Sequence, residues 1–86
     1  MDAYEVIKYP LSTEKSLRLM ESENKLIFVI DKRAKKEDVK KAAEEMFKAK
    51  VVQINTMIDK KGKKRAYIKF DKETPAIDVA TNLGLM

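Results

Sequence analysis

The sequence predicts an α+β fold in which an antiparallel β-sheet packs against helices. Residues 36–48 carry one apolar stripe with helical spacing, and residues 51–59 and 65–70 alternate on either side of a glycine turn. The expected elements follow the order strand, short helix, strand, long helix, strand, strand and short helix. Helices and an antiparallel sheet in this order form a sandwich.

The first two elements are expected to be short. Residues 4–8 are predicted to form an edge strand that Pro10 ends, because proline lacks the N–H group that a sheet uses. Ser12 or Thr13 is a candidate N-cap for a helix that extends to about Met20. A hydroxyl at that position can accept a hydrogen bond from the free N–H groups of the first turn.

A buried strand and the main helix come next. Residues 25–31 form a short apolar run rich in β-branched side chains, which is typical of a buried strand. The helix over residues 36–48 has acids in its first turn and a lysine at its end, as the helix dipole favours. Its apolar side chains are expected to face the core: Val39, Ala42, Ala43, Met46 and Phe47.

The last two strands are expected to form a hairpin in which Gly62 supplies the turn. Alternation assigns inward positions on both strands. These are Val52, Ile54 and Ile58 on the first strand, and Ala66, Ile68 and Phe70 on the second.

A short helix is predicted at the C-terminus. Thr74 is the expected cap, and Pro75 is expected at the first helical position, where proline is tolerated. Ile77, Ala80 and Leu83 are predicted to form its inner face, and Gly84 its end.

Composition argues against an enzyme. The chain has 86 residues with no histidine and no cysteine, so it lacks the commonest general base and the commonest metal ligands. Its only glycines are Gly62 and Gly84, too few for a glycine-rich phosphate loop. We expect one domain over residues 1–86, without a metal, a cofactor or a small-molecule substrate.

No apolar run approaches the ~18 residues that a membrane span needs. The N-terminal residues also lack the basic and then apolar pattern of a signal peptide. We therefore expect the protein in the cytoplasm.

The charge of the chain is segregated along the sequence. The net charge is +5, but residues 32–70 carry +9 while the two ends together carry −4. Because solvated surfaces usually mix their signs, a basic centre of this kind favours a polyanionic partner, most simply a nucleic acid. A lysine-rich soluble surface remains the plain alternative.

Three stretches hold most of this basic charge. The densest is the hairpin tip, with five cations within six residues: Lys60, Lys61, Lys63, Lys64 and Arg65. Such crowding costs electrostatic free energy unless a polyanion neutralises it, although lysines also protect sheet edges against aggregation.

The second stretch enters the long helix, where backbone N–H groups and cations together can bind phosphate, but it equally resembles an ordinary loop. It consists of Lys32, Arg33, Lys35 and Lys36. The third stretch, Lys8, Tyr9, Lys15 and Arg18, is weak by itself.

Groove-reading and base-stacking signatures are absent from the sequence, so phosphate and shape contacts with a folded RNA are expected. Four segments then resemble the motifs of one family. Residues 7–16 place a proline before a Thr-Glu-Lys triplet, and Phe28-Val29 followed by residues 34–40 resembles a strand-to-helix entry. Residues 51–56 resemble a valine-rich strand ending in Asn-Thr, and residues 62–68 a basic final hairpin. In this order they resemble the universal large-subunit ribosomal protein L twenty-three family.

The resemblance implies a small three-layer α/β/α sandwich around a four-stranded antiparallel sheet. It also implies a structural role in the large ribosomal subunit, beside neighbouring ribosomal proteins, with binding to rRNA near the polypeptide exit tunnel. Factors that meet the nascent chain, such as the signal recognition particle, would dock there. Glu14 matches the acid that the family presents to such factors. The positions that match rRNA contacts are Thr13, Lys15, Ser16, Arg33, Lys35, Asn55 and Thr56.

One departure from the family pattern concerns the hairpin. Bacterial members carry a long hairpin extension toward the tunnel interior, whereas about six residues separate the two strands here. The chain therefore resembles the archaeal type, and neither lumen contact nor the trigger-factor partnership of bacterial members is carried over.

Two other functions fit parts of the sequence. A free-standing RNA-binding or RNA-chaperone domain would share the sandwich and the basic charge. A ferredoxin-like hydrolase resembling acylphosphatase would need an arginine in an anion loop and a positioned asparagine, for which Arg33 and Asn55 are the candidates. The scarcity of glycine argues against such a loop.

Overall fold

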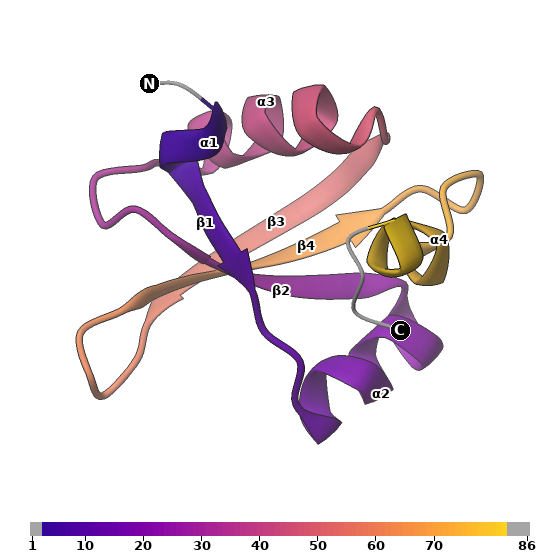
Figure 1. The fold of residues 1–86 in the computed structure, drawn as a ribbon, viewed down its shortest axis with the longest axis horizontal. Helices are drawn as coiled ribbons and strands as arrows, with labels where there is room; N and C mark the ends of the chain where they lie inside the picture. Colours follow the sequence, from indigo (N-terminus) through magenta and orange to yellow (C-terminus); the bar gives the residue numbers. More distant parts are fainter. Residues whose placement is uncertain (1–2, 83–86) are drawn as a thin grey trace.

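A four-stranded antiparallel sheet forms the centre of the molecule in a computed structural model that describes residues 3–82 (Figure 1). The strands lie in the order β1, β2, β4, β3, and each neighbouring pair is antiparallel. Their bounds are Ile7–Pro10 for β1, Lys25–Ile30 for β2, Val51–Ile58 for β3 and Lys64–Phe70 for β4.

Helices lie on both sides of this sheet, which agrees with the α+β sandwich expected from the sequence. The helices are α1 (Ala3–Val6), α2 (Glu14–Glu23), α3 (Lys36–Phe47) and α4 (Ala76–Asn82). Figure 1 shows α1 and α3 above the sheet and α2 below its right-hand end, with α4 beside that end. The β3–β4 hairpin projects from the opposite end of the molecule.

The core lies between the sheet and α3. Phe28 of β2 stacks on Phe47 of α3 with ring centroids 5.3 Å apart, and Phe70 of β4 meets Phe47 edge-on at 6.4 Å. The predicted apolar stripe of α3 is confirmed, since Val39, Ala42 and Ala43 are buried and Met46 and Phe47 pack against the core. The inward side chains of β4 are confirmed as well: Ala66, Ile68 and Phe70.

Asn24 joins α2, β4 and α4. It ends α2 with a φ of 57°, a left-handed conformation that asparagine tolerates better than most residues. Its side-chain amide nitrogen lies 3.0, 3.1 and 3.2 Å from the carbonyl oxygens of Phe70, Asp71 and Thr74 and donates to them. The N–H of Ala76 donates to its Oδ1 at 2.6 Å. Asn24 therefore supplies the hydrogen bond at the start of α4 for which the sequence had suggested Thr74.

The predicted edge strand over residues 4–8 was wrong. Residues 3–6 form the short helix α1, and the strand β1 begins at Ile7 and ends at Pro10. Val6 and Ile7 are consecutive and both buried, one at the end of the helix and the other at the start of the strand. The change from helix to strand between them turns both side chains inward.

The inward assignment of β3 was also wrong at two positions. Val52 is 52% exposed and Ile58 is 66% exposed, and Val51 is buried instead. The register with β4 shifts between Val51 and Gln53, which is a β-bulge, so simple alternation fails at the start of the strand. Ile54 is half-buried and packs against the core, as predicted.

The inner face of α4 differs from the prediction. Ala76, Val79 and Ala80 are buried, whereas Ile77 is 46% exposed, so the assignment of Ala80 was correct and that of Ile77 was wrong. Pro75 precedes the first helical residue, and the predicted positions Leu83 and Gly84 lie outside the described residues.

Within residues 3–82, no helix is long and apolar enough to cross a membrane.

Candidate nucleic-acid interface

The hairpin turn holds its lysines outward on a fixed backbone. Gly62 has a φ of +82°, and its N–H donates to the carbonyl oxygen of Asp59 at 3.0 Å. The Asp59 carboxylate accepts from the N–H groups of Lys61 and Lys63, both at 2.9 Å. The turn thus uses a glycine and an acid to shape the backbone, while the side chains of Lys60, Lys61 and Lys63 are exposed.

The single acid in this turn is already engaged. Hydrogen bonds from the backbone of Lys63 and Lys61 and the charge of Arg65 hold the pKa of Asp59 below its ordinary value. Arg65 forms an ion pair with Asp59, with 3.3 Å between Nε and Oδ2. Asp59 therefore neutralises Arg65 and leaves the lysines of the tip available to a partner.

All three basic stretches of the sequence contribute to one end of the molecule. The ammonium of Lys63 donates to the hydroxyl of Tyr9 at 3.1 Å, and this bond raises the pKa of Lys63 above its ordinary value. The ammonium of Lys64 donates to the carbonyl oxygen of Ala34 at 2.7 Å, which ties the hairpin to the loop before α3. The ammonium of Lys32 reaches the turn as well, since it lies 3.6 Å from the position that a Cβ atom on Gly62 would occupy.

These contacts enclose a hollow of about 170 Å³ whose charged side chains are all basic. Its lining consists of Lys8, Tyr9, Val29, Ile30, Lys32, Lys63 and Lys64. We refer to this hollow, the hairpin tip and the loop over residues 31–35 as the hairpin end.

The loop before α3 also neutralises its own acid. Asp31 accepts from the backbone N–H of Arg33 at 2.8 Å and from its guanidinium at 3.1 and 3.3 Å. The hydrogen bonds from Arg33 lower the pKa of Asp31 to about 2. At the start of α3, Asp38 accepts from the N–H of Lys35 at 3.0 Å, while the Lys35 side chain is exposed. Lys32 and Lys35 therefore remain as exposed cations beside the hairpin.

A polar sheet face continues from the hairpin end. The register places Tyr67 of β4 opposite Asn55 of β3, and Tyr9 of β1 opposite Val29, which in turn lies opposite Arg65. The Lys15 ammonium lies 5.8 Å from the Tyr67 ring centroid, within the range of a cation–π contact. Sequence reasoning left Tyr67 out of the site, although alternation had already placed it outward.

In the segment over residues 13–16, two residues cap the helix α2 and the other two are exposed. The Thr13 hydroxyl accepts from the N–H of Ser16 at 3.2 Å, and the Ser16 hydroxyl accepts from the N–H of Thr13 at 2.7 Å, a reciprocal capping box that confirms the predicted start of α2. Ser16 is only 4% exposed. Glu14 and Lys15 are exposed in the first turn of the helix.

Not every predicted contact residue lies at the hairpin end or on the polar face. Ser16 is buried in the cap, Thr56 lies opposite the buried Ala66 and so shares its helix-covered face, and Lys36 lines a groove between α3 and β3. Arg33 pairs with Asp31, and the described contacts do not join it to Asn55. The arrangement of an acylphosphatase-like anion site is therefore not assembled by these contacts.

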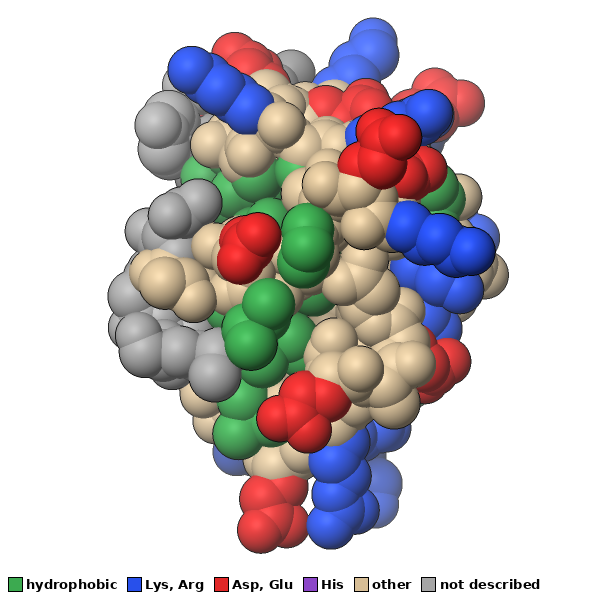
Figure 2. Space-filling view, turned by 90° about the vertical axis from the view of Figure 1, so that its right-hand side faces the viewer, with side chains coloured by type: hydrophobic (Ala, Val, Ile, Leu, Met, Phe, Trp, Pro, Cys, Tyr) green, Lys and Arg blue, Asp and Glu red, His purple; other side chains and the backbone are tan. Residues whose placement is uncertain are grey.

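The opposite end of the molecule has a different surface. Figure 2 looks onto the end that carries α4 and shows hydrophobic side chains with acidic ones among them and both acidic and basic ones around them. Four exposed acids lie on α2, on α4 or beside α4: Glu21, Glu23, Glu73 and Asp78. Exposed cations lie at this end too, with Arg18 on α2 and Lys72 beside α4, so its surface mixes the two signs of charge.

Comparison with known proteins agrees with this geometry. The family model described as ribosomal protein L23 matches residues 5–79. The chain is 54% identical over 85 residues to the large ribosomal subunit protein uL23 of Methanococcus aeolicus, with 99% of both chains covered. It is 47% identical to the proteins of the same name from Methanococcus vannielii and Methanococcus maripaludis, at the same coverage.

Proposed function

Because this chain belongs to the ribosomal protein L23 family, whose members are structural proteins of the large ribosomal subunit, we propose that it binds large-subunit rRNA through its hairpin end and the adjoining polar sheet face. The family is not a family of enzymes. The mechanism is neutralisation of phosphate charge by a surface of fixed shape, without a chemical step.

The observation that carries the proposal is the convergence of the basic stretches. Lys8, Lys32, Lys63 and Lys64 come from three segments far apart in the sequence, yet they line one hollow whose lining includes no acidic residue. Holding four ammonium groups together costs electrostatic free energy in the free protein. A phosphate backbone would remove that cost and release its own counterions.

The polar sheet face extends this surface. Tyr9 and Tyr67 offer ring faces on which an unpaired base could stack, and Lys15 and Asn55 beside Tyr67 offer hydrogen-bond donors. We propose that the hairpin end provides most of the affinity, while the polar sheet face fixes the orientation of the protein on its RNA.

Cell fractionation tests the ribosomal assignment against a free-standing RNA-binding domain. On the proposal, the protein sediments almost entirely with large subunits. Crosslinking in cells and sequencing of the attached RNA then recovers large-subunit rRNA joined to the hairpin end. A protein that sediments mainly as a free species, or that crosslinks to many unrelated RNAs, would support the RNA-chaperone alternative.

We further propose that the protein lies near the exit tunnel and that Glu14 faces a nascent-chain factor such as the signal recognition particle. Glu14 is exposed in the first turn of α2, and no ion pair holds it within residues 3–82. The capping box leaves it unused, since Thr13 and Ser16 satisfy the helix start. An exposed acid can increase the encounter rate and specificity for a basic partner.

A further inference from the structure

The two edges of the sheet differ in their protection against further strand pairing. The edge strand β1 has four residues, carries the exposed Lys8, contains a register shift between Ile7 and Tyr9, and ends at Pro10. Each of these features discourages an additional strand. At the other edge, β3 has eight residues with no charge and no proline, and its register shift is confined to its first residues.

β3 also carries exposed apolar side chains on both of its faces. Val52, Met57 and Ile58 are 52%, 51% and 66% exposed. An exposed, uncharged edge strand of this length tends to pair with strands of other chains, so proteins usually cover such an edge with another segment. Among residues 3–82, no strand lies beyond β3.

The backbone of β3 has hydrogen-bonding groups directed outward. The N–H of Asp59 donates to the carbonyl oxygen of Lys63, so Asp59 faces the hairpin partner. Because successive residues of an antiparallel strand alternate between facing their partner and facing away, Ile54, Thr56 and Ile58 direct their N–H and C=O groups to the open side. These groups would bond to an added strand without breaking any bond between β3 and β4.

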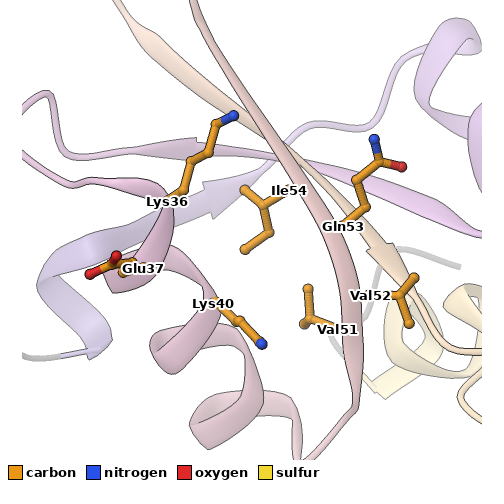
Figure 3. A pocket seen from close by; sticks show the side chains of 7 residues that line it. All are labelled: Lys36, Glu37, Lys40, Val51, Val52, Gln53 and Ile54. Carbon is orange, nitrogen blue, oxygen red and sulfur yellow. The ribbon is translucent and has the colours of Figure 1, made fainter.

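A groove runs along this edge beneath α3. Figure 3 shows Val51 and Ile54 pointing into the space between β3 and α3, with the side chains of Lys36 and Lys40 extending from the helix on the same side. The carboxylate of Glu37 points away from this space. The groove has a volume of about 210 Å³. Its floor is apolar. Its charged lining residues are Lys36, Lys40 and Glu37, so two ammonium groups outnumber the one carboxylate, which points away from the floor.

We propose that β3 and this groove form a docking site for an extended segment of another protein, which adds a fifth strand to the sheet. Alternate side chains of that strand would lie on the face that α3 shares. There, an apolar side chain fits the floor formed by Val51 and Ile54, and a carboxylate meets Lys40 or Lys36. Backbone pairing supplies affinity, and these alternate side chains supply specificity.

A second copy of this chain is a poorer occupant than an acidic, apolar segment. β3 contains no carboxylate to offer the lysines of its partner. Two copies paired edge to edge on a common twofold axis would also bring their α3 lysines toward one another on one face. RNA is poorer still, because the floor is apolar and the open groups are those of a strand edge.

A synthetic peptide tests the proposal directly. The probe is a blocked nine-residue peptide of alternating valine and threonine with two valines replaced by glutamate, so that valine and glutamate lie on the same face, added to the isotopically labelled full chain. The expected result is a set of amide shifts and slowed hydrogen exchange at Ile54, Thr56 and Ile58, with the hairpin end unaffected. Absence of these shifts at about 1 mM peptide, or shifts centred on the hairpin lysines, would overturn the proposal.

Charge reversal supplies the control. Lys40→Glu should weaken binding of the glutamate peptide about fivefold, as expected for one exposed ion pair, and should favour a matched peptide with lysine in place of glutamate. Lys41→Glu changes the same helix outside the groove and should leave both affinities unchanged. Equal effects of the two variants, or concentration-dependent shifts at β3 without peptide, would contradict docking of an acidic segment and, in the second case, identify a second copy as the occupant.

Discussion

The hairpin end and the α2–α4 end use polar residues for different purposes. At the hairpin end, the carboxylates of Asp59 and Asp31 accept hydrogen bonds from turn backbone and pair with arginines. The lysines around the basic hollow therefore have no carboxylate partner in an ion pair among the described residues. At the α2–α4 end, the amide of Asn24 joins β4 to α4 through hydrogen bonds, and exposed acids lie beside exposed cations. If the hairpin end binds RNA as proposed, substitutions at the two ends should affect different properties, RNA affinity at one end and stability at the other.

The largest expected effect is on RNA affinity. Lys60→Ser, Lys61→Ser and Lys63→Ser together remove three exposed cations but leave Lys64, whose ammonium bonds to Ala34. At about 1 kcal/mol for each charge-assisted contact, affinity for a large-subunit rRNA fragment should fall about 100-fold. Thermal stability should change little, because exposed charges contribute little to folding. Filter binding and thermal melting measure the two quantities.

The matched control removes three lysines from elsewhere on the surface. Lys41→Ser, Lys48→Ser and Lys72→Ser give the same net charge, and all three side chains are exposed. Their combined effect on RNA affinity should stay within a few fold. Similar losses for both triple variants would mean that net charge alone, and not the hairpin end, sets the affinity.

The second prediction concerns cohesion at the opposite end. Asn24→Ala removes the amide that bonds to Phe70, Asp71 and Thr74 and accepts from Ala76, and it places a non-glycine residue without a compensating hydrogen bond at positive φ. The expected loss is about 2–4 kcal/mol, or a fall in melting temperature on the order of 10–25 °C. Asn24→Gly should lose less, because glycine adopts that φ freely. RNA affinity of the folded variants should be unchanged, and a large fall would break the separation between the two ends.

The third prediction is a moderate effect on factor docking. Glu14→Gln keeps the size of the side chain and removes its charge. If Glu14 faces a basic factor, mutant large subunits should bind the signal recognition particle a few fold more weakly at low salt, with a smaller difference at high salt. If Glu14 only favours the helix dipole, the isolated protein should melt slightly lower and factor binding should not change. Titration of purified subunits at two salt concentrations distinguishes these results.

The smallest predicted effect is a dependence of stability on pH. The folded pKa of Asp31, about 2, lies below its ordinary value of 3.8, so its contribution is fully present above about pH 4 and is lost as pH falls through 2. Asp31→Asn should therefore lose less stability than the wild type between pH 5 and pH 2 in denaturant titrations. Asp78→Asn, an exposed aspartate at the opposite end, is the matched control and should follow the wild type.

Regular hydrophobic periodicity predicted the buried face correctly in the elements that bury one face along their whole length. The stripe of α3 and the alternation of β4 were confirmed because each element has a single inner face that begins and ends with the element. Short or irregular elements were not predictable in this way. Val52 and Ile58 were misassigned because a bulge and a strand end interrupt the alternation. Ile77 was misassigned because α4 is too short for the spacing of its apolar residues to fix which side faces inward.

The sequence predicted which basic residues belong to the candidate site, but it predicted only part of how they lie relative to one another. Charge density along the chain singled out the hairpin and the loop before α3, which the fold brings together. Nothing in the local sequence indicated that Lys63 bonds to Tyr9 or that Asn24 holds α4, because each bond joins residues that only the tertiary fold makes neighbours. The unguarded edge of β3 likewise requires knowledge of the strand order.

The salt dependence of rRNA binding tests the central claim most directly. If about five phosphates are neutralised, the slope of log K against log salt should be near −4, since each contributes about −0.9 for duplex or −0.7 for single-stranded RNA. Removing Lys60, Lys61 and Lys63 should make the slope shallower by about 2, while the control triple variant should keep the wild-type slope. A wild-type slope shallower than about −1, or an unchanged slope in the hairpin variant, would contradict binding of rRNA phosphates by the hairpin end.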